Sequence, residues 1–246
     1  MSPMGYLEPK PQKSVTQDYE LIHAVQRMDV RPKQLLLTAI SHVNPEVPLS
    51  KQPRPFSVDI TAQQWTETWG ERLNPYRDLK DSVEALQGKR FWIQNDARKK
   101  SWRNWITGAE YHEREGRVTV HLHHDLMPYL CGSMPVFSTL RILHIKGLRS
   151  FASIRLYELT NQFRQSGIRQ ISLDELRSLL ATKDSHPRFT DFRRKVLDKA
   201  VSEVNSKTDL EVSWEPVKKG RSVSGIKFFI KTSTQPDMFP LGVQSS

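Results

Sequence analysis

The sequence contains one cysteine, Cys131, and this scarcity excludes two common ways of stabilising a fold. A single thiol cannot form an internal disulfide, and it cannot build a zinc finger without several histidines. No apolar run reaches the roughly 18 residues of a membrane-spanning helix, and the mean hydropathy is −0.58. The polar N-terminus, MSPMGYLEPKPQKS, lacks the apolar stretch of a signal peptide. We therefore expect a soluble, cytoplasmic protein.

Sequence motifs of common catalytic sites are missing as well. The chain has no G-x-x-x-x-G-K-[ST] phosphate loop, so it has no evident means of hydrolysing ATP. Its serine, histidine and aspartate residues are scattered without a nucleophile elbow. The sequence thus predicts binding and recruitment rather than an enzyme, with no cofactor and no metal.

Positive charge is what the chain has in excess. Lys and Arg number 37 against 27 Asp and Glu, which gives a formal net charge of +10 in 246 residues. Such a balance suits a polyanionic partner better than a neutral small molecule. Nucleic acid is therefore the expected partner class.

A pattern of predicted elements that occurs twice indicates how the chain is organised. Residues 57–86 and 170–204 each begin with an extended piece and enter a small helix at a capping residue, Thr61 or Ser172. Glu175 follows Ser172 at the spacing of a capping box. Each segment then breaks and starts a longer helix, and strands around a basic turn, HEREGR or KKGR, follow. This order predicts an α+β fold of two tandem winged-helix domains related by pseudo-symmetry.

The expected domain boundaries follow from the composition of the two ends and from the repeated pattern. Residues 1–17 and 233–246 are polar and poor in apolar anchors, so we expect a flexible N-terminus and a flexible C-terminal tail. The first winged-helix domain should cover 18–135 and the second 136–232.

The longer helix of the second half, residues 190–205, separates apolar from basic side chains. Phe192, Val196, Leu197, Ala200, Val201 and Val204 share one arc at 100° per residue. Arg194, Lys195 and Lys199 lie on the opposite arc, and Arg188 precedes the helix. Arg193 falls nearer the apolar arc. Arginine forks read guanine edges in a major groove, and neighbouring cations bind phosphates. A merely solvated basic face is the alternative.

Other cations are expected to hold the DNA backbone rather than to read bases. They are Lys218, Lys219 and Arg221 in the second wing, Arg77 and Lys80 on the first long helix, and Arg98, Lys99, Lys100 and Arg103 before the first wing. Five tryptophans of the first half are expected in the core: Trp65, Trp69, Trp92, Trp102 and Trp105.

The stretch VHLHHD, residues 120–125, supports two interpretations. His121 and His123 flank one apolar residue, as the metal ligands of rolling-circle nicking nucleases do, and Tyr129 or Tyr157 would then have to supply a nucleophile. Strand alternation gives a simpler account, in which Val118, Val120 and Leu122 face inward and the histidines face out. Asp125 would then cap a short helix.

Several segments closely resemble one family of DNA-binding proteins. IRLYELTNQFRQSG, RQISLDELRSLL, FTDFRRKVLDKAVSEVN and DLEVSWEPVKKGRSVSGIKFFI resemble the C-terminal half of the plasmid replication initiators that bind iterons. WRNWITGAEYHEREGRVTVHLHHDLMPYL is similar to the first wing of that family and the helix after it. The resemblance covers roughly residues 18–232.

The resemblance implies a function and a division of labour. The second domain would read the bases of directly repeated origin sequences through Arg188, Arg193, Arg194, Lys195 and Lys199. The first would touch the adjacent turn of DNA and carry a dimer surface, although the leucine-zipper-like heptad of many members, through Leu36 and Val43, meets Asp29 here. The implied partners are origin and operator duplex DNA, the host replicative helicase and host initiator, and a second copy in a monomer–dimer equilibrium, with no membrane.

Two further interpretations stand beside plasmid replication and autorepression. The same two domains on an operator would make a transcriptional repressor without an initiator role. The tail sequence QPDMF is similar to the short peptide by which bacterial proteins dock on the sliding clamp, with Gln235, Asp237, Met238 and Phe239 as the candidate contacts.

Overall fold

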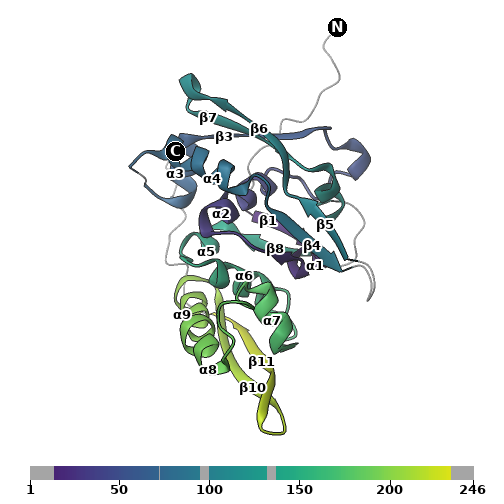
Figure 1. Cartoon of the computed structure of the whole chain (residues 1–246). Helices are drawn as coiled ribbons and strands as arrows, with labels where there is room; N and C mark the ends of the chain where they lie inside the picture. The colour runs from purple at the N-terminus through teal and green to yellow at the C-terminus, as the bar shows by residue number, and fades with distance from the viewer. Residues whose placement is uncertain (1–13, 72, 95–99, 132–136, 234–246) are drawn as a thin grey trace, which may run out of the picture.

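One arrangement of helices and strands occurs twice along the chain (Figure 1). The structure is a computed structural model, and it describes residues 14–71, 73–94, 100–131 and 137–233. The first copy consists of α2 (Val30–Ile40), β3 (Phe56–Thr61), α3 (Ala62–Trp69), α4 (Pro75–Leu86), β6 (Ile106–His112) and β7 (Arg117–Leu122). The second copy consists of α6 (Phe151–Asn161), β9 (Ile168–Ser172), α7 (Leu173–Leu179), α8 (Phe189–Phe192), the π-helical turn η4 (Arg193–Leu197), α9 (Asp198–Lys207), β10 (Leu210–Lys219) and β11 (Ser222–Thr232).

The two sheets have the same topology. Their orders are β3-β7-β6 and β9-β11-β10. In each sheet the last strand in sequence lies at the centre, between the strand that precedes the helices and the other strand of the wing. All four pairings are antiparallel. The predicted fold class, two winged-helix units related by pseudo-symmetry, is therefore confirmed. We call the part from β1 to β8 the first unit and the part from α6 to β11 the second unit.

The first unit carries elements that have no counterpart in the second. A hairpin of β4 (Arg90–Gln94) and β5 (Lys100–Asn104) is inserted between α4 and β6 and forms the sheet β2-β4-β5 with β2 (Val25–Gln26). The other elements are β1 (Ser14–Asp18), α1 (Tyr19–His23), the 3-10 turns η1 (Leu49–Lys51), η2 (Glu113–Glu115) and η3 (His124–Tyr129), and β8 (Phe137–Arg141); α5 (Ile142–Lys146) leads into the second unit.

The pairing of β1 with β8 departs from the expected boundaries. β1 begins at Ser14, inside the segment 1–17 that we expected to be loose, and Ser14 pairs with Arg141. This ladder joins residues from both sides of the expected boundary at 135/136. Sequence patterns could not indicate it, because pairing between strands so far apart leaves no local signal.

Caps and apolar faces form largely as the sequence predicts. Thr61 caps α3 and exchanges hydrogen bonds with Gln64, and Ser172 caps α7 by accepting from the backbone N–H of Glu175. The Glu175 side chain lies 3.7 Å from His23 Nδ1 rather than on the cap. In the core, Trp65 Nε1 donates to Asp78 and Trp69 Nε1 to Thr38, which satisfies both buried indoles.

The zipper-like heptad residues are not available at the surface. Leu36 is fully buried on α2, and Val43 is buried just after that helix. In this conformation they are part of the core and cannot pack against a second copy. None of the helices in the described part of the chain is long and apolar enough to cross a membrane.

A buried cluster of charges joins the two units. Lys33 on α2 and Arg155 on α6 both contact the Glu158 carboxylate, at 2.8 Å and 2.5 Å, and all three side chains are fully buried. Burial by itself raises the pKa of Glu158, but the two cations outweigh it and hold the pKa below its usual value. Around the cluster, Gln17 donates to Glu158, and Lys33 donates to Gln26.

Arg155 extends this cluster to backbone on both sides. Its guanidinium donates to the carbonyls of Ile22 and Ala24 in the first unit and to that of Leu179 at the end of α7. One side chain thereby satisfies acceptors from three segments, and it does so without access to water. The relative placement of the units is fixed at this point.

Glu158→Gln should strongly destabilise the fold. The amide keeps the shape of the side chain but leaves Lys33 and Arg155 buried without a countercharge, which costs about 3–5 kcal/mol. Urea denaturation measures the free energy of unfolding. Glu84→Gln, an exposed position on α4, is the matched control and should change stability little. A loss below about 1 kcal/mol for Glu158→Gln would contradict the account.

His23 should make this junction sensitive to acid. Its imidazole contacts Gln162 and Arg169 at 3.1 Å and 3.2 Å, and burial, aided by the Arg169 charge, lowers its pKa from 6.5 to about 4. At neutral pH the ring is therefore uncharged, and its approach to Glu175 is not an ion pair. Because the folded pKa lies below the unfolded one, the unfolded chain binds the extra proton between these values, and stability falls as the pH drops through them.

We expect the free energy of unfolding to fall more steeply between pH 6.5 and 4 in the wild type than in His23→Gln, which cannot take up the proton. The full difference would be roughly 3 kcal/mol. Urea denaturation at several pH values provides the comparison, and equal slopes for the two proteins would refute the assignment.

Candidate nucleic-acid interface

The helical run from α8 to α9 separates core and surface as predicted. Phe192, Val196, Leu197, Ala200 and Val204 are all buried, and Val201 is half-buried against the core. The exposed side carries the predicted basic residues Arg188, Arg193, Arg194, Lys195 and Lys199. These five cations are thus all exposed along the run from Arg188 through α9, and the helices α8 and α9 lie at the left of the second unit (Figure 1).

A π-helical turn interrupts this run, whereas the sequence predicts a regular α-helix. The turn covers Arg193–Leu197, between α8 and α9. It widens the helix locally, and such turns are frequent at functional sites. We expected Arg193 near the apolar arc; instead its guanidinium lies 5.5 Å from the Trp214 ring centroid and its Nε contacts Asp198 at 3.3 Å.

The cations on this surface differ in how far they are neutralised. Arg194 and Lys195 lie 3.7 Å and 4.0 Å from the Asp191 carboxylate, and exposed pairs at such distances are weak. Arg188 and Lys199 form no ion pair with any described residue. The surface is therefore poorly compensated internally and can accept an anion.

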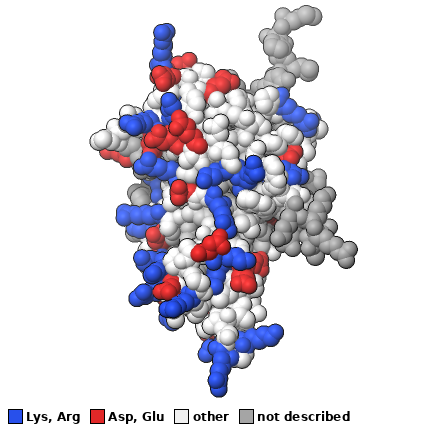
Figure 2. Space-filling model, in the orientation of Figure 1, with Lys and Arg blue, Asp and Glu red and all other residues white. Residues whose placement is uncertain are grey.

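The second wing adds a further basic group. Lys218, Lys219 and Arg221 are all exposed around the turn between β10 and β11, where Gly220 adopts a φ of +64° that favours glycine. Figure 2 shows lysine and arginine side chains at this lower tip and at the lower left over α8 and α9. Helix and wing thus both present cations to solvent.

The corresponding helix of the first unit, α4, is less basic. Arg77 is exposed, but the Lys80 ammonium lies over the Tyr111 ring at 5.4 Å from its centroid. Asp81 and Glu84 share the exposed side. Because these two carboxylates repel anions, the exposed side of α4 is less favourable for an anion than that of α8 and α9.

The basic run before the first wing is only partly described. Arg98 and Lys99 lie outside the described residues, and so does the side chain of Lys100 in β5. Arg103, expected as a phosphate contact, pairs instead with Asp125 at 2.6 Å. Its charge is neutralised within the protein.

The histidines of VHLHHD do not converge as a nuclease site needs. His121 on β7 contacts Ser57 Oγ at 2.8 Å and Glu110 at 3.1 Å, both across the sheet. Val118, Val120 and Leu122 are buried, as strand alternation predicts. Of the candidate nucleophiles, Tyr157 is 1% exposed and donates to Asp209. Tyr129 is half-buried at the end of η3.

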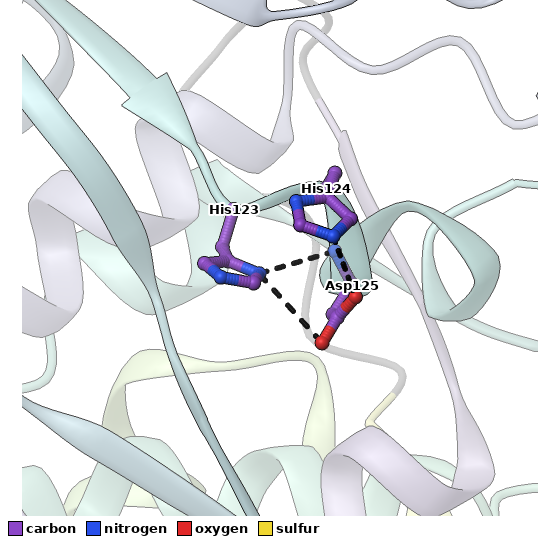
Figure 3. A group of neighbouring side chains, drawn as sticks. All are labelled: His123, His124 and Asp125. Atoms are coloured by element: carbon purple, nitrogen blue, oxygen red, sulfur yellow. Dashed lines mark hydrogen bonds and ion pairs between the residues drawn. The ribbon is translucent and has the colours of Figure 1, made fainter.

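The helix cap after β7 is a correction to the sequence-based expectation. His123, not Asp125, caps the following turn, because its Nδ1 accepts from the Asp125 N–H and the turn is a 3-10 helix starting at His124 (Figure 3). The donor atoms of His123, His124 and Asp125 lie within 4.8 Å of one another. The two rings stack at 4.5 Å, however, and in-plane lone pairs of stacked rings do not point at one ion.

Sequence reasoning misplaced two tryptophans. Trp65, Trp69 and Trp105 are buried as expected, but Trp92 and Trp102 are 39% and 49% exposed on the inserted hairpin. The alternation of side chains along the strand RFWIQ could have predicted this exposure. Neighbouring residues face opposite sides, so a buried Phe91 leaves Trp92 on the exposed side.

Comparisons with known proteins agree with this geometry. Residues 14–161 match the family model described as Initiator Replication protein, WH1, and residues 172–230 match that of Initiator Rep protein, WH2. The PI protein of Escherichia coli is 26% identical over 85% of this chain and 79% of its own length. A replication initiation protein of Escherichia coli is 22% identical over 87% of this chain and 69% of its own.

A third match is partial, and one solved structure has the same fold. An uncharacterized 27.6 kDa protein of Escherichia coli is 29% identical over 44% of this chain, and the match spans 46% of that protein. The crystal structure of the Pi initiator protein in complex with iteron DNA has a TM-score of 0.74 at 23% identity and covers 90% of this chain and 98% of that one.

Proposed function

Because the chain belongs to the family of initiator replication proteins, we propose that it starts plasmid replication by binding direct repeats, or iterons, at an origin. The observation that carries this proposal is the exposed basic surface of α8 to α9 beside a basic wing. The choice of ligand is supported by the Pi initiator protein, whose crystal structure is that of a complex with iteron DNA.

The second unit is the base-reading unit in this proposal. Arg188, Arg194, Lys195 and Lys199 face outward where a recognition helix meets a major groove, and Arg193 stands next to them over Trp214. Lys218, Lys219 and Arg221 of the wing hold the flanking phosphates. Arg77 and Lys80 of α4 touch the adjacent turn of DNA with the first unit.

Recruitment and regulation form the rest of the proposal. The bound protein brings the host replicative helicase and the host initiator to the origin, in the cytoplasm and without catalysis of its own. A dimer represses its own gene at an operator and is in equilibrium with the monomer. Because Leu36 and Val43 are buried, such a dimer uses a surface other than the zipper-like heptad.

Arg194→Ala should weaken binding to the repeats by about 1–3 kcal/mol and reduce the preference among repeat variants. Lys219→Ala should weaken binding to all DNA similarly and lower the salt slope by about one. Fluorescence anisotropy on repeat and random duplexes at several salt concentrations measures both effects.

Lys231→Ala is the matched control, since it removes an exposed charge at the other end of β11. Equal losses on repeat and random DNA for Arg194→Ala would rule out base reading by this helix. Origin function separates initiator from plain repressor: a repressor would bind its operator but would not support replication of a plasmid that carries the repeats.

The tail provides a further contact in this proposal. Gln235, Asp237, Met238 and Phe239 lie outside the described residues and form a short segment similar to clamp-docking peptides. Replacing Met238 and Phe239 by alanine should abolish binding to purified sliding clamp while leaving repeat binding intact, because only the apolar anchors are lost. Unchanged affinity for the clamp would end this part of the proposal.

A further inference from the structure

The hairpin inserted in the first unit exposes two tryptophans side by side. Trp92 on β4 and Trp102 on β5 are direct cross-strand partners, with 39% and 49% of their surfaces accessible. Side chains paired across two strands lie on one face as neighbours. Single exposed apolar residues are ordinary, but two neighbouring exposed indoles together present a large apolar surface to water.

A guanidinium completes this surface. Arg90 precedes Trp92 by two residues on β4, so it lies on the same face, and its guanidinium is 4.0 Å from the Trp102 ring centroid. On the opposite face Phe91 is fully buried and packs against Trp105 at a centroid distance of 4.3 Å. The hairpin is thus anchored in the core while Arg90, Trp92 and Trp102 face solvent.

The chemistry of this surface indicates its ligand. Residues 89–94 and 100–104 contain four Lys and Arg and no Asp or Glu. Arg103 is paired with Asp125, and the other three leave an excess of positive charge that suits a polyanion rather than an apolar protein face. Exposed indoles combined with arginine stack nucleobases, and only unpaired bases have free π-faces, because those of a duplex are stacked on one another.

The surface is also separate from the basic helix of the second unit. In Figure 1 β4 and β5 lie at the right of the first unit, whereas α8 and α9 lie at the left of the second. One ligand on the helix would therefore leave the hairpin accessible to another.

We propose that Arg90, Trp92 and Trp102 form a binding site for single-stranded DNA, with unpaired bases stacked on the two indoles and phosphates near Arg90. This site does not depend on the duplex contacts assigned to α8 and α9. An initiator with both sites could hold a duplex repeat and one unpaired strand at once.

The test compares Trp102→Leu with Trp102→Phe in the full-length protein. A fluorescein-labelled oligothymidylate reports single-strand binding by anisotropy, and a random duplex reports binding elsewhere on the surface. Leucine keeps an apolar residue but removes the π-face, so single-strand affinity should fall at least about fivefold, as for one lost base stack. Phenylalanine should retain most of the affinity, and duplex binding should not change in either variant.

Tyr111→Leu is the matched control, because it removes another exposed aromatic with a cation over its ring, on β6. It should leave oligothymidylate binding unchanged. Trp92→Leu is the second variant if Trp102→Leu does not fold, as judged by circular dichroism, and should show the same loss. Wild-type single-strand affinity in the leucine variants, or an equal loss on duplex DNA, would overturn the proposal.

Discussion

The arrangement of the two units depends on the buried ion pairs that the Glu158 carboxylate forms. This carboxylate forms ion pairs with both Lys33 from the first unit and Arg155 from α6, and none of the three side chains has access to water. Buried charges are tolerated only when they are paired and hydrogen-bonded, so the units can approach in few ways. Whatever DNA binds to both units must fit the spacing that this cluster sets.

The repeated fold carries different chemistry in its two copies. In the second unit, Arg188 and Lys199 and the wing cations are free of ion pairs within the described residues, and Arg194 is only weakly paired. In the first, Lys80 covers Tyr111 and Arg103 is neutralised by Asp125, while an inserted hairpin exposes paired tryptophans. The same architecture thus carries an exposed basic surface in one unit and an exposed pair of tryptophans in the other.

Much of this architecture could be predicted from the sequence because its signals are local. A capping residue such as Thr61 and the apolar arc through Phe192 and Val196 are each recognised within a few turns of helix. The similarity between the two halves is a repeat of such local patterns. The rest depends on distant contacts. The β1–β8 ladder and the Glu158 cluster join segments that are remote in sequence. The π-helical turn at Arg193–Leu197 departs from the rotation of 100° per residue that the prediction of a regular α-helix assumes.

Hydroxyl-radical footprinting of the surrounding replicon DNA tests the central claim most directly, namely that two rigidly joined winged-helix units bind one duplex. The account predicts two protected patches on the same face of the DNA, about one helical turn apart, for each bound molecule. Including a divalent metal reports any strand nicking in the same experiment. A single protected patch, or two patches on opposite faces, would contradict it.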